Sequence, residues 1–210
     1  MDKPVIILGA GGHAKTVADV LLQLNWNIIG FVSPENNGAS DYRGIHVIGD
    51  DEVLSSYSPD NVVLVNGIGT LPNKHLRWNL AAKMRHAGYK FNKVVHPSAI
   101  ISSDVELDEG VHVMAGAVIQ PGTKIGRDSI INTGACIDHD CTIGLECHIA
   151  PGVTISGGCC VGEKTHIGTG TVIIQNISIG NECVIAAGSV IYKNIESNST
   201  FIQPKQSILK

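Results

Sequence analysis

A repeat of six residues constrains the fold of this chain more than any other feature of its sequence. From Ile101 onward, sixteen consecutive hexads follow one another without a gap, and each begins with isoleucine, leucine or valine. Glycines recur at a second interval of eighteen residues, or three hexads, as at Gly116, Gly134 and Gly152. The two periods predict a coil of triangular cross-section, in which three short flat strands point their first aliphatic residue inward and meet at tight corners.

The fifth position of each hexad is also small or medium-sized, and we expect it to share the narrow interior. Examples are Ala117, Cys141, Cys159 and Ser189. All six cysteines lie inside the repeat and none forms a C-x-x-C pair. We therefore expect reduced thiols that act as small buried side chains rather than disulfides.

The first hundred residues follow a different pattern. Apolar runs at 4–8, 27–33 and 61–69 are typical of strands, and residues 12–24 and 73–89 are typical of amphipathic helices. Alternating strands and helices predict a small parallel βαβ (Rossmann-like) domain. We expect this domain to span residues 1–96, and the repeat domain with a short C-terminal tail to span residues 97–210.

The turn after the first apolar run has the sequence G-x-G-x-x-A, from Gly9 to Ala14. Glycines there let the backbone approach a phosphate, and the helix that follows favours an anion at its N-terminus. An NAD site would also need an acidic residue about twenty positions further on, where this chain has Ser33 and Pro34. Three interpretations remain open: NAD, another nucleotide such as a nucleotide sugar, and a tight turn without a ligand.

Charge and hydropathy exclude several classes of partner. The formal net charge is -4 and the 15 basic residues are scattered, so no face suited to nucleic acid is expected. The N-terminal apolar run is broken at once by glycine, which fits neither a signal peptide nor a membrane span. We expect a cytoplasmic protein.

The triplet Asp138-His139-Asp140 places a histidine between two carboxylates within a repeat that is poor in charge. Stacking the coils eighteen residues apart puts Gly157 and Gly158 above His139 and Asp140, which predicts a notch beside the imidazole. A histidine whose basicity is raised by a carboxylate suits a general base. A histidine on a solvated corner is the alternative.

The segments INTGACIDHDCTIG and HIAPGVTISGG, together with the N-terminal GAGGH turn and the strand NGIGT, resemble a known family. They are similar to the hexapeptide-repeat sugar O- and N-acetyltransferases grouped with the sialic acid O-acetyltransferase and the bacillosamine-pathway N-acetyltransferase (NeuD/PglD-like). The resemblance spans nearly the whole chain. It implies a left-handed parallel β-helix, acetyl-CoA as co-substrate, and a homotrimer with active sites between subunits.

The resemblance also implies roles for individual residues. His139 corresponds to the general base, Asp140 to the acid that raises its basicity, and Asn132 to an asparagine of the same site. The positions matching acetyl-CoA contacts are His148, Gly157, Thr169 and Ala187. The positions matching the nucleotide-sugar site are Gly11, Gly12, His13, Gly69 and Ser33. Acidic residues common in the family after the second strand are replaced here by Ser33 and Pro34, which leaves the contact to the base or ribose undefined.

A metal site is not expected. His148 and His166 are neighbours on adjacent coils, but no spacing in the chain supplies a tetrahedral set of ligands.

The function that we expect is acetyl transfer from acetyl-CoA to the amine of a UDP- or dTDP-linked 4-amino-deoxysugar in surface glycan biosynthesis, by direct attack and with a histidine base. O-acetylation of a sialic-acid-type sugar and a non-catalytic nucleotide-sugar-binding scaffold are the alternatives. The sequence leaves open the sugar, the nucleotide, and which of Asp138 and Asp140 assists the histidine.

Overall fold

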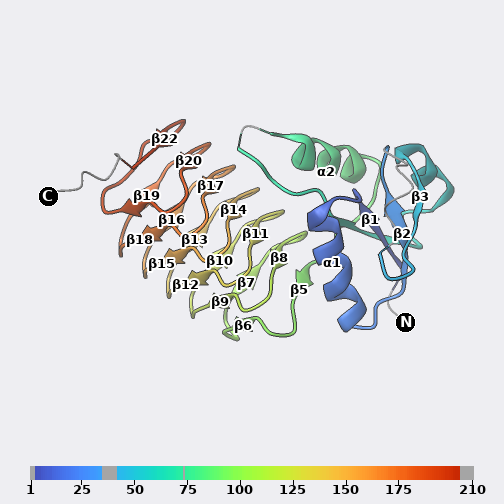
Figure 1. Cartoon of the computed structure of the whole chain (residues 1–210), viewed down its shortest axis with the longest axis horizontal. Coiled ribbons are helices and arrows are strands. Elements are labelled where there is room, and N and C mark those ends of the chain that lie inside the picture. The colour runs from blue at the N-terminus through green and yellow to red at the C-terminus, as the bar shows by residue number, and fades with distance from the viewer. Residues whose placement is uncertain (1–2, 35–41, 73, 204–210) are drawn as a thin grey trace, which may run out of the picture. The chain divides into compact units, whose positions relative to one another are not determined.

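A computed structural model describes residues 3–34, 42–72 and 74–203. The chain divides into two compact units, Met1–Pro97 and Ser98–Lys210. Asn73, at the start of one expected helix, and residues 204–210 of the expected C-terminal tail lie outside the described residues. The two-part prediction, a Rossmann-like unit followed by a parallel β-helix, is confirmed (Figure 1).

The first unit contains a parallel sheet with the strand order β3-β2-β1-β4. Its elements are β1 (Val5–Leu8), α1 (Gly12–Gln23), β2 (Ile28–Val32), β3 (Val47–Gly49), the 3₁₀ helix η1 (Asp51–Ser56), β4 (Val63–Asn66), α2 (Leu76–His86) and β5 (Val94–Val95). The chain passes from β1 outward to β2 and β3 and returns to the other side of β1 at β4. Strand order therefore reverses between β1 and β4, and open α/β sheets bind ligands at such a point, outside the carboxyl ends of the strands.

Apolar packing holds the sheet and the second helix together. All four residues of β1 are buried, because helices cover parallel sheets on their faces. One core cluster joins Ile6 and Leu8 of β1 and Leu64 of β4 to Ala81 and Met84 of α2. This core fixes the carboxyl ends of β1 and β4, where the glycine turn begins.

The second unit is a parallel β-helix of two-residue strands, with three sides that we name A, B and C. Side A consists of β6 (Ile100–Ile101), β9 (Val118–Ile119), β12 (Cys136–Ile137), β15 (Thr154–Ile155), β18 (Val172–Ile173) and β21 (Val190–Ile191). Side B consists of β7 (Glu106–Leu107), β10 (Lys124–Ile125), β13 (Thr142–Ile143), β16 (Cys160–Val161) and β19 (Ser178–Ile179). Side C includes β8 (His112–Val113), β11 (Ile130–Ile131), β14 (His148–Ile149), β17 (His166–Ile167), β20 (Val184–Ile185) and β22 (Thr200–Phe201). Edge AB is the row of turns from side A to side B, and edge CA is the row from side C to side A.

The sixteen hexad leaders predict the strands correctly. Each leader is the second residue of one strand from β6 to β21, and from Val113 onward every leader is buried. The fifth positions Ala117, Cys141, Cys159 and Ser189 are fully buried as predicted, and all six cysteines are free thiols. The expectation that every cysteine is buried is wrong for Cys136 and Cys160, which are exposed because each is the outward first residue of its strand. The interior is therefore filled by two residues of each hexad.

The last coil departs from the eighteen-residue period. Strands pair at an interval of eighteen, as Val172 does with Val190, until Val184 pairs with Thr200 at an interval of sixteen. An isolated bridge between Ile179 and Ile195 has the same shorter interval. The sequence pattern gave no sign of this shorter coil.

In the part of the chain that the structure describes, no helix is long and apolar enough to cross a membrane.

Inward and outward residues of one strand should differ sharply in their effect on stability. Ile143 of β13 is 1% exposed, whereas its neighbour Thr142 is exposed. Ile143→Ala should lower the free energy of unfolding by about 2–5 kcal/mol, because it leaves a cavity in the packed interior. Thr142→Ala should change it by no more than about 0.5 kcal/mol. Denaturant unfolding of the two variants measures both, and equal losses would contradict the inward assignment.

Candidate active site

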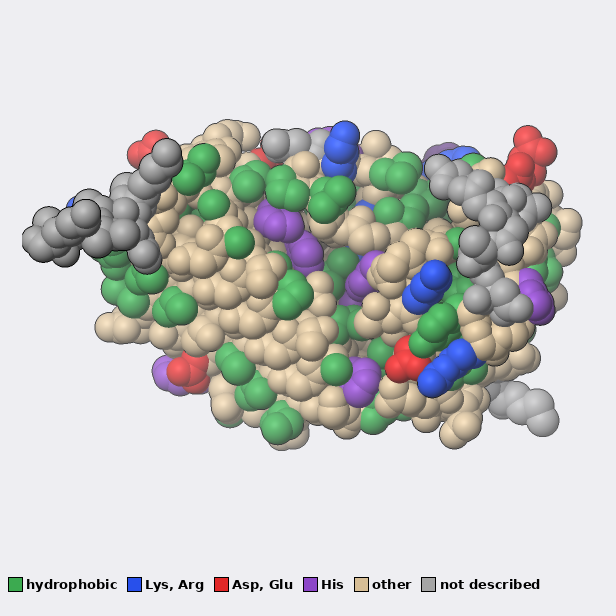
Figure 2. All heavy atoms as spheres, in the orientation of Figure 1, with side chains coloured by type: hydrophobic (Ala, Val, Ile, Leu, Met, Phe, Trp, Pro, Cys, Tyr) green, Lys and Arg blue, Asp and Glu red, His purple; other side chains and the backbone are tan. Residues whose placement is uncertain are grey.

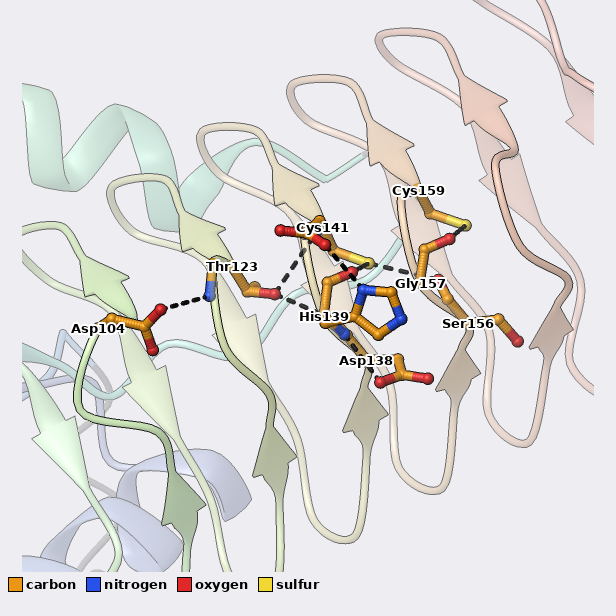
Figure 3. A network of polar contacts seen from close by, with 10 residues as sticks. Asp104, Thr123, Asp138, His139, Cys141, Ser156, Gly157 and Cys159 are labelled. Atoms are coloured by element: carbon orange, nitrogen blue, oxygen red, sulfur yellow. Dashed lines mark hydrogen bonds and ion pairs between the residues drawn. The ribbon is translucent and has the colours of Figure 1, made fainter.

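The turn between β12 and β13, on edge AB, carries the acidic triplet (Figure 3). The ring Nδ1 of His139 lies 2.8 Å from Oδ2 of Asp140. The backbone N–H of His139 donates to Oδ1 of Asp138, also at 2.8 Å. The two carboxylates thus have separate tasks: Asp140 contacts the imidazole, and Asp138 holds the backbone below it.

Asp140 has a left-handed backbone, with φ of +58°, a conformation that aspartate tolerates better than most side chains. The equivalent residues one coil before and one coil after it are Gly122 and Gly158, which have the same sign of φ. A Cβ added to Gly122 would lie 2.5 Å from Oδ1 of Asp140. Glycine on the preceding coil therefore makes room for the carboxylate, and the turn carries an aspartate where glycine would fit the backbone best.

Gly157 lies against the imidazole on the following coil. A Cβ added to Gly157 would lie 2.6 Å from Nε2 of His139, so only glycine allows the ring its position. The side chain of His139 is still 60% exposed. Gly158 does not contribute to this space, because its added Cβ would meet Asn176 instead. The predicted opening above the ring therefore depends on Gly157 alone.

The two carboxylates raise the pKa of His139. The hydrogen bond that the ring donates to Asp140 is the largest cause, followed by the negative charge of Asp138, and burial opposes them. A carboxylate at Nδ1 favours the tautomer that carries its proton there, which leaves the lone pair on Nε2. The nitrogen beside Gly157 is then the basic one.

A buried hydroxyl supports the triplet from inside the β-helix. Oγ1 of Thr123 donates to the carbonyl of Asp138 at 2.9 Å and accepts the N–H of Cys141 at 3.3 Å (Figure 3). Thr123 therefore fixes both ends of the turn that presents His139. Sequence reasoning missed this residue, although its fifth position in a hexad identifies it as an interior residue one coil below Cys141, which follows the triplet.

The thiol nearest the imidazole is unsuited to nucleophilic chemistry. Cys141 is fully buried, and burial raises its pKa to about 11. The thiol of Cys159, one coil further on, is buried as well and its pKa is also raised by burial. Thiolates are the reactive form of cysteine, so these residues act as interior packing.

A second polar group lies on side C and edge CA. Nδ2 of Asn132 is 3.1 Å from Nε2 of His148, and Nδ1 of His148 is 3.2 Å from Nδ1 of His166. The N–H of Thr133 donates to Oδ1 of Asn132 at 2.8 Å, which orients the amide toward His148. Burial lowers the pKa of His166. Figure 2 shows histidine side chains gathered over the side C strands.

Two further expected cofactor residues lie along the same edge. Thr169 and Ala187 are exposed in the turns that follow β17 and β20, and they are linked by the N–H of Gly188, which donates to the carbonyl of Thr169 at 2.8 Å. Within the described residues, no group of three or more histidine, cysteine, aspartate or glutamate side chains is placed to hold a metal ion.

The residues predicted to form one site thus fall into two groups within a single chain. His139, Asp140 and Gly157 lie on edge AB. The residues on side C or edge CA are Asn132, His148, Thr169 and Ala187. Side A separates the two edges, so one chain does not bring these groups together.

The expected nucleotide-sugar residues lie at the carboxyl edge of the first unit's sheet. Gly11 and Gly12 are exposed, and a Cβ added to either would meet nothing within 4 Å. The first turn of α1 has no side-chain cap and no acidic residue. A Cβ added to Gly69 would lie 3.5 Å from Cβ of His13, so these two expected residues are neighbours. Ser33 follows β2 directly, and its N–H donates to the carbonyl of Gly49 at 2.9 Å.

Comparisons with known proteins match a family to each of the two units. The PglD N-terminal domain family matches residues 4–84, and the bacterial transferase hexapeptide family (six repeats) matches residues 122–157. A search of curated proteins found no match.

Several solved structures are similar over almost the whole chain. A variant of perosamine N-acetyltransferase from Caulobacter crescentus, in complex with CoA and GDP-perosamine, is 34% identical, with 94% of this chain and 92% of that chain covered and a TM-score of 0.87. The acetyltransferase domain of PglB from Neisseria gonorrhoeae, in complex with acetyl coenzyme A, is 31% identical, with 95% and 96% covered and a TM-score of 0.86. WeeI from Acinetobacter baumannii, at 23% identity, with 98% and 99% covered and a TM-score of 0.79, shares the fold.

The contact between Asp140 and His139 predicts how the imidazole titrates. Asp140→Asn should lower the pKa of His139, because the carboxylate that favours the protonated ring is lost. Asp138→Asn should lower it less, and Asp108→Asn, at another corner of the β-helix, should leave it unchanged. NMR titration of labelled histidine side chains measures the three values. An unaltered pKa in Asp140→Asn would show that the hydrogen bond does not form in solution.

Proposed function

The chain belongs to the hexapeptide-repeat sugar acetyltransferases with a PglD-type N-terminal domain, which use acetyl-CoA, and we propose that it acetylates the amine of a nucleotide-linked 4-amino-deoxysugar. The observation that carries this proposal is the His139 imidazole, held by Asp140 and seated on Gly157. UDP and dTDP were the nucleotides expected from the sequence. The GDP-perosamine bound by the Caulobacter enzyme adds GDP to the candidates.

In the proposed reaction the sugar amine attacks the thioester carbonyl carbon of acetyl-CoA directly. Nε2 of His139 takes a proton from the amine as the C–N bond forms, and the N–H of Gly157 stabilises the oxyanion. The carbon–sulfur bond then breaks, and the imidazolium returns its proton to the departing CoA thiolate. A covalent acyl-enzyme is not required, in keeping with the buried thiols of Cys141 and Cys159.

The raised pKa of His139 determines the expected dependence on pH. An imidazole accepts a proton only when it is neutral, so the rate should rise with pH through an apparent pKa above that of an ordinary histidine. A more basic imidazole also takes a proton from an attacking amine more readily. Asp140 therefore makes the His139 imidazole a stronger base and lowers the fraction of it that is neutral at low pH.

The first unit is proposed to bind the nucleoside diphosphate part of the nucleotide sugar. Its support is the open glycine turn at Gly11 and Gly12, which precedes an uncapped helix N-terminus at the switch point of the sheet. His13, which follows this turn, and Gly69, on the loop after β4, are neighbours. Ser33 offers a hydroxyl rather than a carboxylate after β2, so recognition of the ribose or base differs here from that of relatives with acidic residues at this point.

We propose a homotrimer whose active sites lie between chains. Its support is the separation of His139 and Gly157 on edge AB from Asn132, His148, Thr169 and Ala187 on side C and edge CA. A second chain would bring the missing group to each edge. Side A, which lies between these edges, presents exposed valines at 172 and 190, which are 40% and 42% exposed, and an outward apolar row suits burial against a partner.

The proposed activity predicts a selective defect in His139→Ala. The wild-type protein should release CoA from acetyl-CoA in the presence of at least one GDP-, UDP- or dTDP-linked 4-amino sugar. His139→Ala should bind acetyl-CoA normally but turn over roughly a hundredfold to ten-thousandfold more slowly, and it should lose the pH-dependent limb.

The same assay contains its counter-tests. Free CoA released only with sialic acids would replace N-acetylation by O-acetylation as the activity. A folded His139→Ala protein within about threefold of the wild-type rate would be too active for the proposed base.

A further inference from the structure

The last residue of β4, Asn66, and the three residues that follow it, Gly67, Ile68 and Gly69, form a loop that packs tightly against the glycine turn. A Cβ added to Gly67 would lie 2.7 Å from Cβ of Ala14, and one added to Gly9 would lie 3.0 Å from Cγ1 of Ile68. The two segments approach so closely because glycine replaces a side chain on both. A shift of the loop toward the turn would therefore displace the turn.

A buried arginine holds this loop. Arg77, in the first turn of α2, is 1% exposed, and its Nη1 donates to the backbone carbonyls of Asn66 and, at 2.7 Å, of Ile68. Asn66 also bonds to Arg77, because its Nδ2 donates to the backbone carbonyl of Arg77 at 2.9 Å. Its Oδ1 accepts the N–H of Ile68 at 3.2 Å, within the loop. Helix α2 and the loop thus donate hydrogen bonds to each other.

A buried guanidinium is a costly way to attach a helix to a sheet. Arginine is almost never fully buried, and removing its charge from water costs several kcal/mol before any contacts are made. The helix already packs through Trp78, Ala81 and Met84, which are apolar and buried. The position of the charge, at the carboxyl edge of the sheet and against the loop that adjoins the glycine turn, indicates a task beyond packing.

We propose that Arg77 is a positioning residue for the nucleoside diphosphate part of the nucleotide sugar. It fixes the loop of residues 66–69, and through that loop the turn of residues 9–14, in the conformation that receives the phosphates. Its buried positive charge, bonded to the loop that packs against the turn, would also favour an anion there. The inference rests on the proposed function of the turn, and it adds a residue that contacts neither substrate.

The test measures two affinities for each variant by calorimetry, one for GDP, UDP and dTDP as probes and one for acetyl-CoA. Arg77→Gln should weaken binding of the preferred nucleoside diphosphate roughly tenfold or more, because the charge and the paired bonds to the loop are lost. Acetyl-CoA affinity should stay within about twofold, because its proposed site lies on the β-helix. Arg77→Lys should fall between the two, since it keeps the charge but not the planar fork.

Arg85 provides a matched control on the same helix. It lies in the last turn of α2, and its guanidinium is 4.6 Å from the centroid of the Phe91 ring, so Arg85→Gln should leave both affinities unchanged. Asn66→Ala removes the other half of the hydrogen-bonded set while keeping the charge. Asn66→Ala should weaken binding of the nucleoside diphosphate and leave acetyl-CoA affinity unchanged. It replaces Arg77→Gln in the test if that variant does not fold.

The outcomes separate the two claims. Wild-type protein that binds a nucleoside diphosphate, with Arg77→Gln or Asn66→Ala binding it equally well, would overturn the role of Arg77 alone. Equal weakening of nucleotide and acetyl-CoA binding would show that the arginine serves general stability. Wild-type protein that binds none of the three diphosphates would overturn the proposed function of the turn and this inference with it.

Discussion

The structure depends on one constraint: every sixth residue must enter an interior wide enough for only two small or aliphatic side chains per side. The leaders from Val113 onward meet it, as do fifth-position residues such as Cys141 and Thr123. Because this interior fixes each coil on the one before, corner residues eighteen apart are stacked. The chemistry can therefore be placed on corners without affecting the core, and a single glycine such as Gly157 can open space over a histidine on the preceding coil.

Stacking also explains why the predicted active-site residues are divided between two edges. Residues six apart occupy successive corners, so Thr133 beside Asn132 and His139 lie on different edges although they are close in sequence. Two edges of one regular β-helix cannot approach each other. An enzyme built on this scaffold needs either an added domain or a neighbouring chain to complete a site, and the outward valines of side A favour a neighbouring chain.

Much of this could be predicted from the sequence because it follows from periodicity. The sixteen strands, the inward cysteines and the placement of Gly157 over His139 all follow from counting in sixes and eighteens. Functional roles of residues that do not follow the six- or eighteen-residue period could not be predicted in this way. Arg77 and Asn66 are isolated polar residues whose contacts depend on tertiary packing, and the carboxylate that serves the imidazole depends on the backbone of Asp140. The family resemblance implies sites between subunits, but it does not say which residues of one chain lie on which edge; the strand assignments supply that division.

Complementation between two inactive variants tests most directly whether the catalytic base of one chain works with the opposite edge of another. His139→Ala and Asn132→Ala chains, carrying different affinity tags, would be co-expressed and mixed trimers isolated by tandem purification. If sites are shared, activity should return at about a third of the sites, because in every mixed trimer one of the three interfaces pairs an intact histidine from one chain with an intact asparagine from another. Activity no greater than that of the two variants assayed separately would contradict the account and place the whole site within one chain.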